Sequence, residues 1–308
     1  MKIKIGTRGS KLALWQAYHV KDLLEAKGAE AEIVTIETKG DKIQNVTIAK
    51  IGSKGVFTEE IEEQLQSGAI DIAVHSAKDM QSTLPEGFEI IAFGEREKTA
   101  DVLVSHKVID LNQEGLVLGT SSTRRLSFLK KNHPNVKTVA VRGNLQTRIR
   151  KMEEGACDAL WLAYAGVHRM QYDDKIVHTF PVEEYIPAVG QGSIAIEVFH
   201  TLDKEKRDLV RTAINHAPTE TCLIAERAFL KKMDGGCSIP VFGLATIAND
   251  MVSLTGGIIS LDGQLVIKDT STTTSEKAML AGELLANHVL DHGGKELLKE
   301  IKITQSEQ

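Results

Sequence analysis

The sequence predicts an α/β protein with two mainly parallel sheets, followed by a smaller α+β region. Over the first two-thirds of the chain, short apolar runs alternate with stretches of helical periodicity, a rhythm typical of βαβ units. The last third instead places three consecutive strand-like runs between two helices. The length of 308 residues corresponds to about two or three domains.

The apolar pattern locates the individual elements. In the first block we expect strands at 2–6, 30–37, 69–74 and 88–93, with helices at 11–26 and around 57–65. The rhythm restarts with strands at 116–118, 138–141 and 158–163 and helices at 125–131 and 147–154. The final region has a helix at 220–233, strands at 241–247, 252–259 and 264–268, a helix at 276–288, and a polar tail at 302–308 that we expect to fray. Parallel strands are covered on both faces, so each block should be a sheet between helices.

Composition and charge exclude several classes of protein. The apolar fraction of 42% is close to that of globular proteins, which argues against disorder. A net charge of −5 does not suit a globally basic nucleic-acid binder. No apolar run reaches the ~18 residues of a membrane span, and no signal peptide is seen. The three cysteines form no CxxC pair, so we expect a reduced, cytoplasmic protein without disulfides or a metal.

Polar residues recur where a predicted strand ends and a helix begins. Ligands of open α/β sheets bind at the carboxyl ends of strands. Capping is the favoured role for Thr120, Ser121 and Ser122 taken singly. Five arginines fall in or just after these turns, which favours a polyanionic ligand: Arg8, Arg124, Arg125, Arg142 and Arg148. Carboxylates and phosphates remain equally suitable, although neither a P-loop nor a GxGxxG after a strand is present.

Three further segments have both a structural and a functional interpretation. Asp79 beside Lys78 is either a surface charge pair or an ionised carboxylate that stabilises a cation. The Gly-flanked segment with Lys54 and Phe57 is either a simple turn or a mobile flap. Cys237 follows two glycines and precedes Pro240, so it lies on a tight, accessible loop. A modified thiol and an inert one are equally supported there, whereas Cys157 and Cys222 are predicted to be core residues.

Taken together and in order, these residues resemble the hydroxymethylbilane synthase (porphobilinogen deaminase) family. The resemblance is collinear from Ile3 to about Ala245. Its motifs are Gly6-Thr7-Arg8 with Ser10, Gly55-Val56-Phe57, His75-Ser76 with Lys78-Asp79, Gly119-Thr120-Ser121-Ser122 with Arg124-Arg125, Arg142-Gly143-Asn144 with Arg148, Gly190-Gln191-Gly192, and Gly235-Gly236-Cys237 with Pro240. Each motif is weak alone, but their order and spacing together are specific.

The resemblance implies a fold of three domains. Two are α/β domains like the lobes of periplasmic binding proteins, with the site in the cleft, and the third is a small α+β domain that carries the cofactor cysteine. In this sequence the domains would be 1–97 plus 193–213, 98–192 and 217–308. The return of the chain to the first domain after Gly192 is implied by the resemblance alone.

The resemblance also implies an activity. A dipyrromethane cofactor would be joined through a thioether to Cys237. Four porphobilinogen molecules would be added in turn with loss of ammonia, and hydrolysis would release linear hydroxymethylbilane for later tetrapyrrole enzymes. A monomer that binds neither nucleic acid nor membrane is expected.

The site residues carried over by the resemblance have stated roles. Asp79 would stabilise the positive azafulvene formed from the substrate, with Arg8 as its catalytic companion. The residues expected to bind cofactor and substrate are Ser10, Lys54, Phe57, Ser76, Lys78, Thr120, Ser121, Ser122, Arg124, Arg125, Arg142, Gly143, Asn144, Arg148, Arg169 and Gln191.

The sequence departs from the common family pattern at two places. Gln81 stands where the family often has Pro, and Lys98-Thr99-Ala100 replaces a segment that usually contains Arg. Two alternatives compete with the synthase, and these departures bear on the second of them. One is an anion-binding module on the same scaffold, which has no use for Asp79 among arginines or for a loop cysteine. The other is a homologue that has lost activity.

Overall fold

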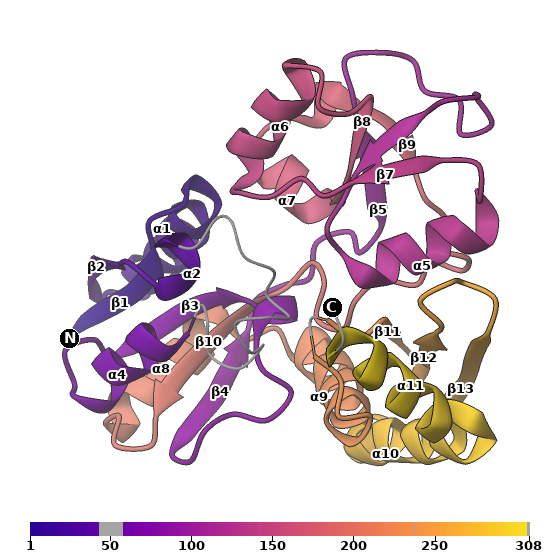
Figure 1. The fold of residues 1–308 in the computed structure, drawn as a ribbon. Helices are drawn as coiled ribbons and strands as arrows, with labels where there is room; N and C mark the ends of the chain where they lie inside the picture. The colour runs from indigo at the N-terminus through magenta and orange to yellow at the C-terminus, as the bar shows by residue number, and fades with distance from the viewer. Residues whose placement is uncertain (43–57, 237, 307–308) are drawn as a thin grey trace. The chain divides into compact units, whose positions relative to one another are not determined.

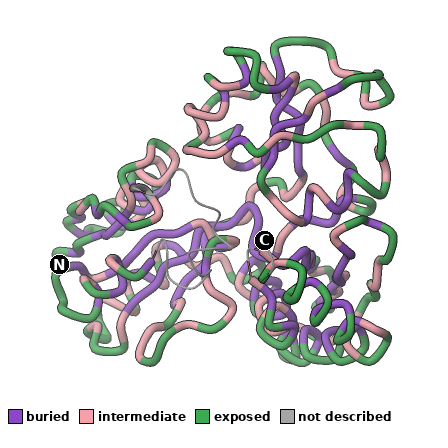
Figure 2. Tube along the Cα trace, viewed as in Figure 1, coloured by how far each residue is buried: buried purple, intermediate pink, exposed green. Residues whose placement is uncertain are grey.

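The computed structural model describes residues 1–42, 58–236 and 238–306 (Figure 1). The chain forms two compact units, one of Met1–Glu97 with Gly192–Glu220 and one of Lys98–Gln191 with Thr221–Gln308. Buried residues concentrate along the strands of each sheet (Figure 2). The finer division into three domains stays a prediction.

The first unit is built on one five-stranded sheet. Its strands are β1 (Lys2–Arg8), β2 (Glu30–Ile36), β3 (Ile72–Ser76), β4 (Phe88–Phe93) and β10 (Ile194–Phe199). Their order is β2-β1-β3-β10-β4, with β1 parallel to β2 and β3. The late strand β10 runs antiparallel to both of its neighbours. It brings the chain back into this sheet after Gly192, as the resemblance implies.

Side-chain alternation along the strands gives this sheet two buried faces. One face, with Ile3 and Val74, packs against α1 (Lys11–Glu25) and α8 (Lys204–Ile214). The opposite face, with Ala73, packs against α4 (Glu59–Gln66) through Ile61 and Leu65. A short helix α2 (Lys39–Lys42) and the 3₁₀ turn η1 (Ala77–Asp79) complete the described part of the unit.

The second unit contains a second five-stranded sheet. Its strands are β5 (Asp101–Val104), β6 (Val117–Gly119), β7 (Lys137–Val139), β8 (Ala159–Ala163) and β9 (Ile176–Thr179), in the order β7-β6-β8-β5-β9. Again three strands are parallel and β5 is antiparallel to both neighbours. The helices α6 (Leu145–Glu153) and α7 (Tyr164–Arg169) pack on one face, and α5 (Thr123–Asn132) packs on the other.

The second unit also holds an antiparallel sheet of three strands. The strands β11 (Val241–Ala248), β12 (Met251–Ile259) and β13 (Val266–Thr274) pair in sequence order. The helices α9 (Ala217–Lys232), α10 (Ala278–Val289) and α11 (Lys295–Ser306) share one apolar core with this sheet. Phe242 of β11 packs on Phe128 of α5, with ring centroids 5.2 Å apart.

The predicted fold class is confirmed, with corrections at particular elements. A frayed tail was predicted at 302–308, but residues 302–306 are helical. They continue α11, which buries Ile301. The third strand of the last sheet runs to Thr274, not 268, because its exposed face is polar and shows no apolar alternation. β5, β9 and α8 were not predicted as separate elements.

Candidate functional site

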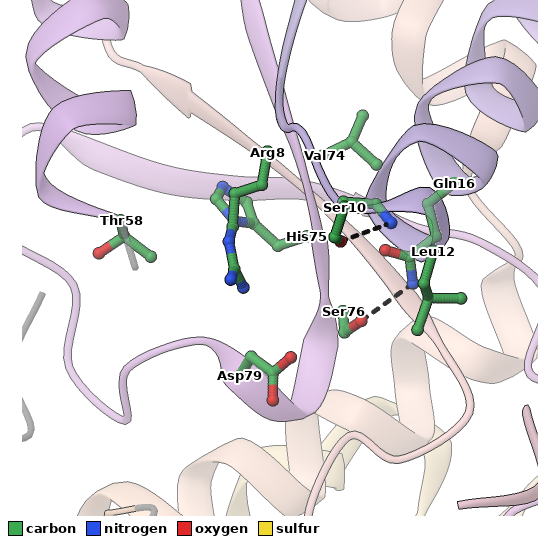
Figure 3. Close-up of a pocket in the computed structure, with 10 residues that line it drawn as sticks. Arg8, Ser10, Leu12, Gln16, Thr58, Val74, His75, Ser76 and Asp79 are labelled. Atoms are coloured by element: carbon green, nitrogen blue, oxygen red, sulfur yellow. Dashed lines mark hydrogen bonds between the residues drawn. The ribbon is translucent and has the colours of Figure 1, made fainter. Parts of the chain in front are cut away.

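A hollow opens at the carboxyl ends of β1 and β3 in the first unit (Figure 3). It contains about 490 Å³ of empty space and is open to solvent. Its lining residues are Arg8, Ser10, Leu12, Ala13, Gln16, Thr58, Val74, His75, Ser76 and Asp79. Four predicted site residues therefore come together here: Arg8, Ser10, Ser76 and Asp79.

Local sequence explains how these residues are placed. Arg8 ends β1, and Ser10 then caps α1, where its hydroxyl accepts a hydrogen bond from Ala13 N at 3.3 Å. The Gln16 amide donates to Ser76 Oγ at 2.9 Å, which ties α1 to the end of β3. The chain turns directly after β3 into η1, whose last residue is Asp79. The turn is fixed because Ala77 N donates to Ser193 O at 2.9 Å.

The hollow combines a cation and a carboxylate. Figure 3 shows the Arg8 guanidinium and the Asp79 carboxylate directed into the same space. A guanidinium can hold a carboxylate through two hydrogen bonds. An ionised aspartate accepts hydrogen bonds and stabilises a nearby positive charge. The site can therefore orient an anionic molecule that carries N–H groups and develops positive charge.

Sequence reasoning missed the buried groups behind this hollow. His75 of β3 lines it, and Glu197 of β10 lies 3.1 Å from His75 when measured from Nε2 to Oε2. Glu62 of α4 is also buried. Side chains alternate between the two faces of a strand, so Glu197 lies on the same face of β10 as Ala195. An acidic residue in an otherwise apolar strand was therefore the sequence signal for this buried group.

Arg124 and Arg125 of the second unit occupy an enclosed position on the α5 side of its sheet. Arg124 Nη2 donates to Asp101 Oδ2 at 2.6 Å, and Arg125 Nη2 donates to Asp101 Oδ1 at 2.7 Å. The arginine side chains are only 5% and 9% exposed, and that of Asp101 is fully buried. Their binding role stays a prediction, but this geometry favours a positioning role at the strand ends.

Asp101 is the centre of this cluster. Burial opposes its ionisation, but Arg124 and Arg125 outweigh burial and hold the pKa of Asp101 well below its usual range. The predicted site residue Gln191 also contacts it, because Nε2 donates to Asp101 Oδ1 at 3.0 Å and to Thr99 O at 2.7 Å. Asp101 was not predicted from the sequence, although it accepts hydrogen bonds from three predicted site residues, Arg124, Arg125 and Gln191.

Residues 142–144 form the turn before α6, and Arg148 lies in the first turn of that helix. Asn144 caps the helix, and its side chain accepts a hydrogen bond from Thr147 N at 2.9 Å. Gly143 has a φ of +113°, and a Cβ atom there would lie 2.7 Å from Thr147 Cγ2, so the turn requires glycine. Arg148 Nε donates to Gly143 O at 2.7 Å. Arg142 therefore lies on the turn after β7, and Arg148 lies in the helical turn that follows, which agrees with the prediction that they fall in or just after a strand-to-helix turn.

The predicted capping role of residues 120–122 is wrong for their side chains. Ser122 is the N-cap residue of α5, but its side chain makes no capping hydrogen bond. Thr120 Oγ1 instead accepts from Ser122 N at 3.3 Å, and Ser121 Oγ donates to Val141 O at 3.3 Å.

Two further predicted site residues lie in helical segments. Arg169 ends α7, and Lys78 lies in η1 beside Asp79.

Three predicted residues, Lys54, Phe57 and Cys237, lie outside the described residues. The prediction that the other cysteines belong to the core is confirmed, since Cys157 and Cys222 are both buried. Burial, with the nearby Asp158, raises the pKa of the Cys157 thiol to about 11, which makes it inert.

Within the ranges that the structure describes, no group of three or more His, Cys, Asp or Glu is placed to hold a metal ion. None of the helices described is long and apolar enough to cross a membrane.

Comparison with known proteins decides the family. A family model described as "Porphobilinogen deaminase, dipyromethane cofactor binding domain" matches residues 3–207, and the C-terminal domain of the same family matches residues 220–291. The chain belongs to the porphobilinogen deaminase family.

The porphobilinogen deaminase of Desulfosudis oleivorans is 54% identical over 99% of this chain and 100% of its own length. That of Cytophaga hutchinsonii is 57% identical over 97% of each chain. The solved structure of the methionine-binding protein MetQ is 14% identical over 69% of this chain and 93% of its own, with a TM-score of 0.43.

The residues of the hollow fit the cofactor named in the family description. A dipyrromethane carries acetate and propionate groups together with pyrrole N–H groups. Arg8, Ser10 and Ser76 can donate to carboxylates, and Asp79 can accept from N–H groups. The donor set of the hollow therefore matches the group on both counts.

Proposed function

We propose that this chain is a hydroxymethylbilane synthase, which condenses four porphobilinogen molecules head to tail and releases ammonia at each addition. Hydrolysis then frees the linear hydroxymethylbilane. The observation that carries the proposal is that Arg8 and Asp79 line one hollow. The family relatives match this chain over 97% to 100% of their length. When bound, the dipyrromethane supplies the pyrrole carbon to which the first porphobilinogen is joined.

Arg8 has the role of orienting the substrate. Porphobilinogen carries two carboxylates, and a guanidinium binds a carboxylate through two parallel hydrogen bonds. Ser76 Oγ is held by Gln16 at 2.9 Å, so its position beside the hollow is fixed before substrate arrives. Fixed donors of this kind hold two reacting groups in position at little entropic cost.

Asp79 has the role of stabilising positive charge. When the ammonium group of porphobilinogen leaves as ammonia, the substrate is left with a cationic pyrrole system. An ionised carboxylate beside the pyrrole N–H stabilises that cation, and it needs no reorganisation because η1 already holds it in place. Lys78, Lys54 and Phe57 are proposed to make further contacts, the last by stacking on a pyrrole ring.

The second unit is proposed to bind the remaining carboxylates of the growing chain. Arg142, Arg148 and Arg169 are its candidates, with backbone N–H groups of Gly143 and Asn144 nearby. Thr120, Ser121 and Ser122 would add hydroxyl donors. Arg124, Arg125 and Gln191 are grouped around Asp101, which suits them to hold the strand ends from which these residues project.

Cys237 is proposed as the attachment point of the dipyrromethane through a thioether. The protein is further proposed to be a cytoplasmic monomer that passes its product to later tetrapyrrole enzymes.

The intact mass of freshly purified protein tests the attachment. We expect wild-type protein to carry the extra mass of two linked pyrrole units, and a Cys237→Ser variant to lack it. Cys222→Ser is the matched control and should keep the added mass. A wild-type protein that stays unmodified after incubation with porphobilinogen would indicate a binding module or an inactive homologue.

Substitution of Asp79 tests the chemical role. Asp79→Ala should lower the rate of hydroxymethylbilane formation by about 10²- to 10³-fold, as expected when a preorganised electrostatic group is removed. Asp174→Asn, which changes an exposed aspartate of the other unit, is the control and should keep the wild-type rate. Asp79 is exposed, so the variant should fold normally by circular dichroism. Near-normal activity of Asp79→Ala would refute the role.

A further inference from the structure

The hollow is backed by a buried cluster of two carboxylates and one imidazole. Glu62 comes from α4, His75 from β3 and Glu197 from β10. All three residues are buried, and Glu197 is completely so. Of the three, only His75 lines the hollow. His75 is therefore the residue through which this buried cluster can exchange protons with a molecule bound in the hollow.

Strand register brings His75 and Glu197 together. Ala195 pairs with His75, and Glu197 pairs with Ala73, so His75 and Glu197 are diagonal neighbours on one face of the sheet. That face is the one that α4 covers, because Ala73 packs there against Ile61 and Leu65. His75 Nε2 lies 3.1 Å from Glu197 Oε2, which leaves Nδ1 as the ring nitrogen that does not face the carboxylate.

Glu197 has little other compensation for its burial. Among the residues that the structure describes, neither of its carboxylate oxygens has an aligned hydrogen-bond donor. A buried carboxylate without donors is stable only beside a positive charge or with a proton of its own. The contact with His75 places beside Glu197 a group that can carry such a charge.

Glu62 adds a second acidic group to the cluster. Gln81 Nε2 donates to Glu62 Oε1 at 3.3 Å and to Thr58 Oγ1 at 3.1 Å. Burial raises the pKa of Glu62, and the charge of Glu197 adds to this effect against the opposing influence of Thr58 and His75. The other charged groups around the cluster are Arg8 and Asp79 at the hollow and Glu59 on α4.

We propose that His75, supported by Glu197 and Glu62, holds and exchanges the proton that each condensation releases at the hollow. This inference rests on the proposed function. When a new carbon–carbon bond forms, the attacking pyrrole carbon loses its hydrogen as a proton, and the C–H electron pair stays with the ring. The proton passes to Nδ1 of His75, and the departing ammonia carries it away as ammonium. Glu197 and Glu62 are positioning residues, because they act only through His75.

The pH dependence of turnover tests this inference. We expect His75→Gln to lower kcat by about 10²-fold with little change in KM, the loss typical of a missing proton-transfer group. The pH inflection of kcat that this proton transfer produces should vanish in this variant. In Glu197→Gln the inflection should move to lower pH, because a neighbouring negative charge favours the protonated imidazole. His200→Gln, at an exposed residue directly after β10, and Glu89→Gln, at a half-exposed residue of β4, are the controls and should keep the wild-type profile.

A spectroscopic titration gives a readout that does not depend on activity. In protein labelled at the histidine ring carbons, the His75 signal is identified by its absence from His75→Gln. Its titration midpoint should shift between wild type and Glu197→Gln, while the other histidine signals stay in place. An unchanged midpoint, or a His75→Gln variant with the wild-type kcat profile, would overturn the inference. Failure of wild-type protein to form hydroxymethylbilane would instead refute the proposed function and leave the coupling of His75 and Glu197 to be decided by the titration alone.

Discussion

The two five-stranded sheets share one topology but treat a buried carboxylate in different ways. Each sheet has three parallel strands, β1, β2 and β3 or β6, β7 and β8, and in space the second of the three comes first, then the first, then the third. An antiparallel strand then lies between the third parallel strand and the strand at the edge of the sheet. That antiparallel strand is β10 in the first sheet and β5 in the second, and each carries a completely buried acid, Glu197 or Asp101. The two acids face different helices, α4 and α5 respectively.

The partners of these acids separate the two regions. Asp101 has two guanidinium groups at 2.6 and 2.7 Å, and both of its oxygens accept hydrogen bonds from them. Among the residues that the structure describes, the charged partner of Glu197 is an imidazole, whose charge depends on pH. Permanent charges suit a rigid strand end, whereas a titratable partner suits a place where protons are exchanged. The same fold thus supports a fixed end in one unit and a proton-exchanging one in the other.

Removal of the acid in the second unit should have the largest effect. Asp101→Asn keeps the shape but leaves two buried guanidinium groups without a counter-charge, which should lower the free energy of unfolding by about 3–5 kcal/mol. Trp161 lies in the core of the same unit, so urea unfolding followed by its fluorescence in a Trp15→Phe background measures the loss. The matched control is Asp174→Asn, an exposed site that should unfold like wild type. A change below 1 kcal/mol would mean that the cluster is not the fixed element that the comparison requires.

A third buried carboxylate, Glu226 of α9, accepts hydrogen bonds from two backbone groups and should have an intermediate effect. Gly190 N and Ala245 N each donate to one of its oxygens at 2.8 Å. In Glu226→Gln the amide nitrogen would face one of these donors, so one buried N–H group would lose its acceptor. We expect a loss of about 1.5–3 kcal/mol in the same unfolding measurement, with Glu283→Gln on α10 as the exposed control. A loss well below about 1 kcal/mol would contradict this expectation.

The sequence predicted those parts of the fold that leave a periodic apolar pattern. The strands β1, β3 and β8 and the helices α1 and α5 all fell near their predicted places. β5 was missed because this four-residue strand begins with an aspartate. An aspartate is rarely buried unless it is paired, and the sequence does not show the pairing. The place of β10 in the first sheet could not come from periodicity, because strand pairing across 100 residues leaves no local signal.

The site was predictable where function requires exposed polar residues at strand ends. Arg8, Ser10, Ser76 and Asp79 were found because each follows or ends a strand. Arg124 and Arg125 occupy equally suggestive turns, yet they are buried on Asp101. An arginine at a turn looks the same in sequence whether it faces a ligand or a buried acid 23 or 24 residues away. His75 and Glu62 were missed for a related reason, since only the packing of α4 shows that they meet.

The smallest expected effect, and the sharpest contrast between the two sheets, is the pH dependence of stability. The pKa of Glu62 is raised in the folded protein, so its favourable contribution is complete below its unfolded value near 4.5 and is lost as pH rises through the folded value. The pKa of Asp101 is lowered, so its contribution is complete above 3.8 and is lost only as pH falls toward its folded value. Between pH 4 and 8, Glu62→Gln should therefore gain stability relative to wild type as pH rises, by less than the loss expected at Asp101. Urea unfolding followed by circular dichroism at several pH values measures this gain, with Glu63→Gln on the exposed side of α4 as control. Parallel pH curves for Glu62→Gln and wild type would mean that the first sheet is as insensitive to protons as the second.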